Sequence, residues 1–116
     1  MNKIYNVFLK IPTIYILLRD ILIGKILPIL SEKKKFELIY KTGYWKSKNS
    51  DSFSGGGSNI ESTSKIRRSL QKFLQEREIK TMLDLPCGDW NWMSKVDLTG
   101  IEYIGGDIVD DIIFKN

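Results

Sequence analysis

The chain of 116 residues contains no histidine and a single cysteine, Cys87. One cysteine cannot form a disulfide within the chain, and without histidine neither a zinc site nor a non-haem iron site is expected. The side chain most often used as a general base near neutral pH is missing as well. Any chemistry must therefore depend on carboxylates, Lys, Tyr, Cys or a bound cofactor, and no metal site is predicted.

Long uncharged runs are also missing, even from the apolar N-terminal segment, residues 1–30. Its longest uncharged stretch is Ile11–Leu18, whereas a membrane-spanning helix needs about 20 mostly apolar residues. Most of its polar residues fall on one side of a helical projection, which leaves a wide apolar face. A helix pair packed on a core is the favoured interpretation, and an interfacial helix in peripheral contact with a membrane is the alternative. Without a signal-peptide pattern, the cytoplasm is the expected compartment.

The net charge of +4 is mild, and the basic residues are spread along the chain without a recognised nucleic-acid motif. They are typical of solvated helix faces, so no nucleic-acid partner is expected. With 42% hydrophobic and 28% charged residues, the composition is that of one globular domain.

Three regions follow one another along the chain. After residues 1–30, residues 31–58 combine a helix, capped by Ser31 and stopped by Gly43, with a Gly/Ser-rich loop. Residues 59–116 read as a helix over about 60–77, a strand over 79–85, a short helix, a strand over 101–107 and the start of a further helix; Ser58 and Glu61 form a capping-box pattern for the first of these helices. This alternation predicts an α/β fold with a doubly wound parallel sheet, preceded by N-terminal helices.

Both predicted strands end near an acidic residue, Asp84 in the first and Asp107 in the second. Ligands of open parallel sheets bind beyond the carboxyl ends of the strands. Gly88, in the turn after the first strand, permits close approach of a ligand to the backbone. Asp107 lies 19 residues later, close to the spacing of about 20 at which a carboxylate meets ribose hydroxyls in nucleotide folds. The alternative is structural, with Asp84 capping a helix and Asp107 serving a turn.

The turn lacks the G-x-G-x-x-G pattern that admits a pyrophosphate, and the chain has no G-x-x-x-x-G-K-[ST] phosphate loop. A nicotinamide dehydrogenase is therefore disfavoured. An adenosine cofactor without phosphates fits better, and S-adenosyl-L-methionine is the natural candidate.

The stretch MLDLPCGDWNWM, followed by YIGGDIV, resembles the first two motifs of the class I S-adenosylmethionine-dependent methyltransferases. The resemblance implies a Rossmann-like domain. Asp84 matches the acid of the usual acid-x-Gly-x-Gly-x-Gly loop and Gly88 its middle glycine, while Pro86 and Trp90 replace the outer two. The form D-x-P-C-G-D, after an upstream SGGGS segment, is similar to a bacterial subgroup associated with surface polysaccharides.

The resemblance also implies roles for individual residues. The backbone of Pro86, Cys87 and Gly88 would lie along the methionine part of the cofactor, and Asp84 would lie near its amino group, directly or through water. Asp107, followed by Ile108, would hold the ribose hydroxyls, and Asp89 and Trp90 would begin the next helix and touch the cofactor. No catalytic residue is identified.

Other conspicuous residues have simpler interpretations. Cys87 lacks an evident activating group and is expected to be a packed turn cysteine rather than a nucleophile. Trp90, Trp92 and Met93 are expected in the core rather than around a sulfonium. The glycines at 55–57 are either a flexible connector or a lid over the cofactor.

The resemblance covers only the first part of such a domain, because later strands and the residues beside the methyl acceptor are not found. The sequence therefore predicts a truncated cofactor-binding part, inactive alone, that needs a complementary chain. Its methyl acceptor would be a sugar hydroxyl or another small molecule. The alternative is a non-enzymatic fragment that docks on a membrane or protein partner through residues 1–30.

Overall fold

The computed structural model describes residues 3–116, with side chains described from residue 13 onward. The chain divides into two compact units, residues 1–35 and residues 36–116, and each is described by itself.

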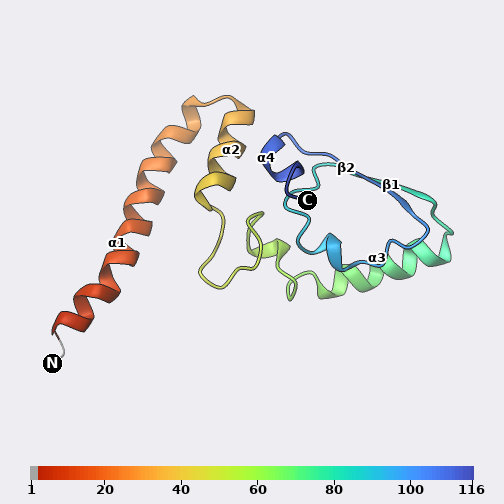
Figure 1. Cartoon of the computed structure of the whole chain (residues 1–116), viewed down its shortest axis with the longest axis horizontal. Helices are drawn as coiled ribbons and strands as arrows, with labels where there is room; N and C mark the ends of the chain where they lie inside the picture. Colours follow the sequence, from red (N-terminus) through yellow and green to blue (C-terminus); the bar gives the residue numbers. More distant parts are fainter. Residues whose placement is uncertain (1–2) are drawn as a thin grey trace. The chain divides into compact units, whose positions relative to one another are not determined.

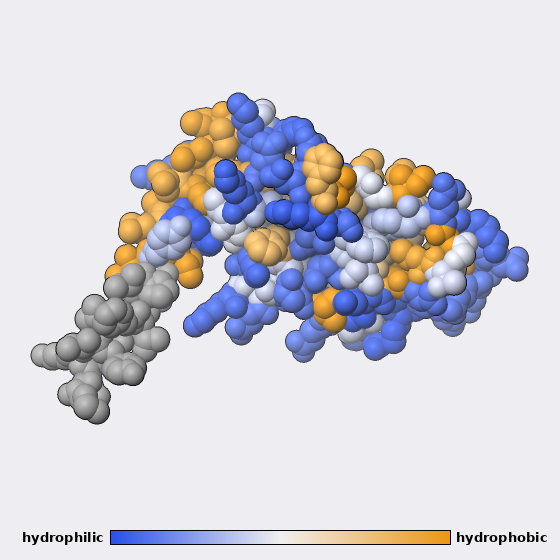
Figure 2. Space-filling view, viewed as in Figure 1, coloured by the Kyte–Doolittle hydropathy of each residue, from blue (hydrophilic) through white to orange (hydrophobic). Residues whose placement is uncertain are grey.

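The first unit is dominated by one helix, α1 (Lys3–Ile26), followed by the 3₁₀ helix η1 (Leu27–Ile29). The expected helix pair is therefore wrong: α1 is continuous from Lys3 to Ile26, and Pro28 lies in the 3₁₀ helix that follows it. Apolar side chains cover much of the part of α1 whose side chains are described, residues 13–26 (Figure 2), and the large exposed ones in this part are Ile14, Tyr15, Ile16, Leu17, Leu18, Ile21 and Leu22. Within residues 3–116, no helix is long and apolar enough to cross a membrane.

Helix α2 (Glu32–Thr42) ends at Gly43 as predicted. Gly43 has a φ of 62°, a conformation that glycine adopts without a steric penalty. The N–H of Tyr44 bonds to the carbonyl of Ile39 at 3.0 Å, and the N–H of Gly43 bonds to that of Tyr40 at 3.3 Å. This pair of bonds is the Schellman motif, and it turns the chain sharply out of the helix.

Helix α3 (Ser64–Glu76) begins later than predicted, and the expected capping box is wrong. Ser58 lies in the 3₁₀ helix η2 (Gly56–Ser58) instead. Thr63 precedes α3, and its hydroxyl donates to the carbonyl of Asn59 at 2.7 Å. A hydroxyl bonded back to the preceding turn cannot cap the helix that follows.

Two short strands, β1 (Thr81–Asp84) and β2 (Glu102–Gly105), pair in parallel, with Thr81 opposite Glu102 and Asp84 opposite Gly105. They run side by side above α3 (Figure 1). The predicted parallel pairing is confirmed, and the second unit is a mixed helix-and-strand structure with a small parallel sheet.

One face of this sheet is covered and the other is open. Met82 and Tyr103 face a core formed by Leu74 of α3, Met93 and Val96. On the opposite face, Leu83, Leu85 and Ile104 are 67%, 67% and 48% exposed. A doubly wound sheet carries helices on both faces, so within residues 3–116 the architecture corresponds to an incomplete α/β layer.

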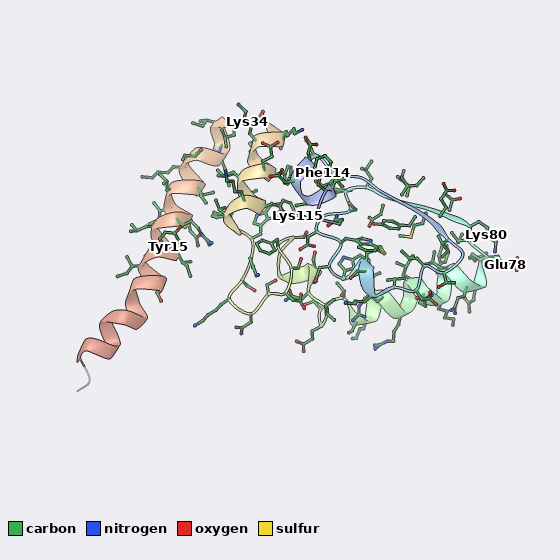
Figure 3. All side chains as sticks on the ribbon, in the orientation of Figure 1. Tyr15, Lys34, Glu78, Lys80, Phe114 and Lys115 are labelled. Atoms are coloured by element: carbon green, nitrogen blue, oxygen red, sulfur yellow. The ribbon has the colours of Figure 1, made fainter. Side chains whose placement is uncertain are left out.

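Where a short helix was predicted, the connection between the strands contains turns and the three-residue 3₁₀ helix η3 (Met93–Lys95). Trp90 has a φ of 54°, which interrupts a right-handed helix at that point. Helix α4 (Asp110–Ile113) follows β2. Phe114 and Lys115 lie near the carboxyl ends of the strands, far from Glu78 and Lys80 at the other end (Figure 3).

Candidate functional site

The turn after β1, residues 85–90, is bonded to the end of β2. The N–H of Gly106 donates to the carbonyl of Asp84 at 3.0 Å, and the N–H of Cys87 donates to the carbonyl of Gly106 at 2.8 Å. These bonds continue the strand pairing beyond β1, so the turn and the segment after β2 are held together. The sequence-predicted residues of both motifs therefore meet at the carboxyl end of the sheet.

Gly88 is required at its position for two reasons. Its φ of 58° is costly for any residue with a Cβ atom. A Cβ there would also lie 2.6 Å from the Oγ of Ser54 and 3.2 Å from the hydroxyl of Tyr40. The turn thus lies in direct contact with side chains of the upstream helix and loop.

Asp107 is oriented by two backbone groups. Its Oδ2 accepts from the N–H of Gly88 at 3.1 Å, and its Oδ1 accepts from the N–H of Val109 at 3.0 Å. A carboxylate has about four acceptor positions, so two bonds fix its direction while leaving further capacity toward a ligand.

Asp84 is bonded to the second strand. The hydroxyl of Tyr103 donates to its Oδ2 at 2.6 Å. Burial raises the pKa of Tyr103, and the hydrogen bond to the Asp84 carboxylate raises it further. The phenol therefore remains protonated and continues to donate to Asp84 at neutral pH.

Asp89 joins the turn to the serine loop, residues 50–60. Its carboxylate accepts from the Oγ of Ser52 at 2.9 Å, the Oγ of Ser54 at 3.0 Å, the N–H of Phe53 at 2.6 Å and the N–H of Asn91 at 3.3 Å. Ser52 is fully buried. The Asp89 N–H in turn donates to the Oγ of Ser54 at 3.1 Å. The serine loop thus bonds to both the carboxylate and the backbone N–H of Asp89.

Asn91 adds a second connection between the same two segments. Its Nδ2 donates to Asp51 at 2.8 Å and to the carbonyl of Ser58 at 3.2 Å. The serine loop is therefore fixed on both sides of its three glycines. Neither connection was anticipated from the sequence, because each joins residues more than thirty positions apart and no local spacing signals it.

The turn and the serine loop border a cavity of about 520 Å³, a volume within the usual range for small-molecule sites. It is lined by Phe36, Tyr40, Trp45, Ser54, Ser58, Leu85, Pro86, Cys87, Gly88, Asp89, Trp92, Asp107 and Ile108. Six of the eight residues predicted to bind a cofactor are in this set: Pro86, Cys87, Gly88, Asp89, Asp107 and Ile108.

The other two predicted residues, Asp84 and Trp90, do not line the cavity. Trp90 packs against the core cluster, and its ring centroid lies 5.8 Å from that of Tyr103. Asp84 faces the same tyrosine. Both residues thus support the covered face of the sheet and the base of the turn.

Sequence reasoning did not identify the aromatic wall, which we define as Phe36, Tyr40 and Trp45. The Trp45 ring meets Phe36 edge-on at a centroid distance of 5.7 Å and Tyr40 at 6.5 Å. The hydroxyl of Tyr40 lies 2.7 Å from the Oγ of Ser54. The only signal in the sequence is the cluster of aromatic residues just before the Gly/Ser-rich loop.

The cavity lining is acidic and aromatic. Asp89 and Asp107 contribute carboxylates, and none of the lining residues is basic. Burial raises the pKa of Tyr40, and the negative charges of Asp107 and Asp89 raise it further. The negative field of both carboxylates therefore reaches the aromatic wall.

Cys87 lines the cavity as a thiol. Burial raises its pKa, and the charges of Asp107 and Asp84 add to this effect. A thiol with a raised pKa is a poor nucleophile at neutral pH. Within residues 3–116, no group of three or more Cys, Asp or Glu side chains is arranged to hold a metal ion.

Comparison with protein-family models, with curated proteins and with solved structures finds no match to this chain. The chemistry of the cavity must therefore be argued from its own residues. Their geometry provides an oriented carboxylate at Asp107, a half-buried backbone turn at Gly88, and aromatic rings in the same lining.

The bonds around Asp89 generate a prediction about the serine loop. In Asp89→Asn, one carboxylate oxygen becomes an amide nitrogen that cannot accept from the hydroxyl and N–H groups facing it. A hydrogen bond to a charged group contributes about 1.5–3 kcal/mol, so the amides of Phe53 and Ser54 should exchange with deuterium roughly 10- to 150-fold faster. Asp111→Asn, at an exposed aspartate, is the control. Unchanged exchange at Phe53 and Ser54 would contradict the role given to Asp89.

Proposed function

We propose that this chain is the cofactor-binding part of a methyltransferase that uses S-adenosyl-L-methionine. The observation that carries the proposal is the cavity at the carboxyl ends of two parallel strands. It combines carboxylates and aromatic rings with no basic residue in its lining. In parallel sheets this edge is where ligands bind, and the sign of the charge there restricts which ligands are suitable.

The charge of the cavity favours a cationic adenosine derivative. Dinucleotides and nucleoside phosphates carry negative charge and are held by N–H groups or basic side chains. The carboxylates of Asp89 and Asp107 would repel them. S-adenosyl-L-methionine carries a positive sulfonium and a positive ammonium against one carboxylate, so its net charge is opposite to that of the cavity.

Individual residues support the same ligand. The free acceptor capacity of Asp107 suits the two hydroxyls of a ribose. The turn residues Pro86, Cys87 and Gly88 line the cavity beside Asp107, so the methionine part could lie along them. Asp84 lies outside the cavity lining and is bonded to Tyr103, so we assign it no contact with the cofactor and propose that it supports the turn.

Methyl transfer from this cofactor is an in-line displacement at the methyl carbon, and positioning supplies most of its catalysis. The methyl acceptor would be a hydroxyl of a sugar or of another small molecule. We propose that a complementary chain or further elements complete a Rossmann-like layer, because the face of the present sheet that helices would cover exposes Leu83, Leu85 and Ile104. Without that completion we expect cofactor binding and no turnover.

Isothermal titration of the full chain with S-adenosylhomocysteine tests the proposal. We expect saturable binding to the unaltered chain. Each hydrogen bond between the ligand and the Asp107 carboxylate that is lost in Asp107→Ala should weaken this binding by roughly 10- to 150-fold. NADH should not bind, because its pyrophosphate meets two carboxylates. Asp111→Ala is the matched control and should leave the affinity unchanged.

Two results would count against a methyltransferase cofactor site. One is the absence of heat at millimolar S-adenosylhomocysteine with a chain that is folded by circular dichroism. The other is NADH binding that Asp107→Ala strengthens, as the removal of a repelling charge would produce.

A second candidate function rests on α1, whose described part exposes seven large apolar side chains between Ile14 and Leu22. Such a helix can lie in the surface of a bilayer, and basic residues then favour anionic lipid. The chain would in that case be a peripheral docking module on the cytoplasmic side of a membrane, with or without a cofactor.

Liposome flotation with the full chain tests this second candidate. We expect co-flotation with vesicles of phosphatidylglycerol, and its loss in Leu18→Glu, because a charge within the apolar surface opposes insertion. Ser47→Glu adds the same charge outside α1 and should still float. Failure of the unaltered chain to float would exclude a membrane role for α1.

A further inference from the structure

The aromatic wall has a feature that the proposed function does not use. Phe36 and Tyr40 come from one helix, α2, and Trp45 comes from the segment just after it. The three rings contact one another edge-on around Trp45, and Trp45 remains 41% exposed. All three residues line the cavity, so their rings form part of its surface.

The position of the wall is defined by its contacts with the turn. The hydroxyl of Tyr40 lies 2.7 Å from the Oγ of Ser54, and a Cβ at Gly88 would lie 3.2 Å from that hydroxyl. Gly88 is in turn bonded to Asp107 at 3.1 Å. The hydroxyl of Tyr40 therefore adjoins the turn beside the proposed ribose acceptor, and Trp45 packs edge-on against Tyr40.

In S-adenosyl-L-methionine the sulfonium is the atom that joins the adenosine to the methionine. With the ribose at Asp107 and the methionine along the turn, the sulfonium would lie between them, opposite the aromatic wall. A cation over an aromatic face is attracted by the negative charge of the ring face. The carboxylates of Asp89 and Asp107 strengthen the preference for positive charge at this point.

We propose that Phe36, Tyr40 and Trp45 recognise the positive sulfonium, and that they distinguish the cofactor from its demethylated product. This inference rests on the proposed function. In the transfer, the acceptor oxygen forms a bond to the methyl carbon and releases its proton to water. The sulfur keeps the electron pair of the broken bond and becomes a neutral thioether. Loss of the charge removes the attraction to the rings, which favours release of the product over the cofactor.

The experiment compares the dissociation constants of three probes: S-adenosyl-L-methionine, S-adenosylhomocysteine and adenosine. In Trp45→Leu, binding of S-adenosyl-L-methionine should weaken about 2- to 30-fold more than binding of S-adenosylhomocysteine, the range spanned by cation–π contacts. Binding of adenosine should not change. Trp45→Phe retains a ring and should keep most of the preference. Phe73→Leu, on α3 and outside the cavity, is the control.

The other outcomes have distinct meanings. Equal weakening of all three probes in Trp45→Leu would show that the ring stacks on adenine, and it would overturn sulfonium recognition while leaving the cofactor site intact. Equal weakening of the two methionine-bearing probes alone would overturn it as well, because the ring would then contact the methionine chain. Binding of none of the probes to the unaltered chain would refute the proposed function and this inference together.

Discussion

The candidate site depends on the hydrogen bonds that the carboxylate of Asp89 accepts. This carboxylate accepts from side-chain or backbone groups of Ser52, Phe53 and Ser54, and so fixes the serine loop against the turn after β1. Hydrogen bonds to a charged group are about twice as strong as neutral ones. Because Ser54 also meets the hydroxyl of Tyr40, the same contacts hold α2 at the edge of the cavity.

A second constraint is the distribution of charge. The whole chain has a net charge of +4, but the cavity lining contains carboxylates and no basic residue. A negative cavity in a positive chain is not produced by composition alone. A negative lining favours cationic ligands, and Asp107 and Gly88 belong to the same lining; this is the basis of the proposed cofactor.

Local signals predicted part of this structure. The strands, their parallel pairing and the meeting of Gly88 with Asp107 follow from apolar runs, a glycine and acids at the strand ends. The predicted helix start at Ser58 is wrong, because Thr63 and Asn59 form a tight local turn before the helix. The roles of Asp89 and the aromatic wall could not be predicted, because they depend on contacts such as Ser54–Asp89, 35 positions apart. The three glycines suggested a flexible loop, but contacts of the same long-range kind fix this loop on both sides.

The most direct measurement is an amide NMR titration of the full chain with S-adenosyl-L-methionine. The N–H groups of Gly88 and Val109 both donate to Asp107, so a ribose bound to that carboxylate should shift both resonances together and to saturation. The resonance of Gly100, in the exposed turn at the opposite end of the strands, should stay unchanged. Saturating shifts at Gly100, or ligand binding without shifts at Gly88 and Val109, would contradict a cofactor site at the carboxyl ends of β1 and β2.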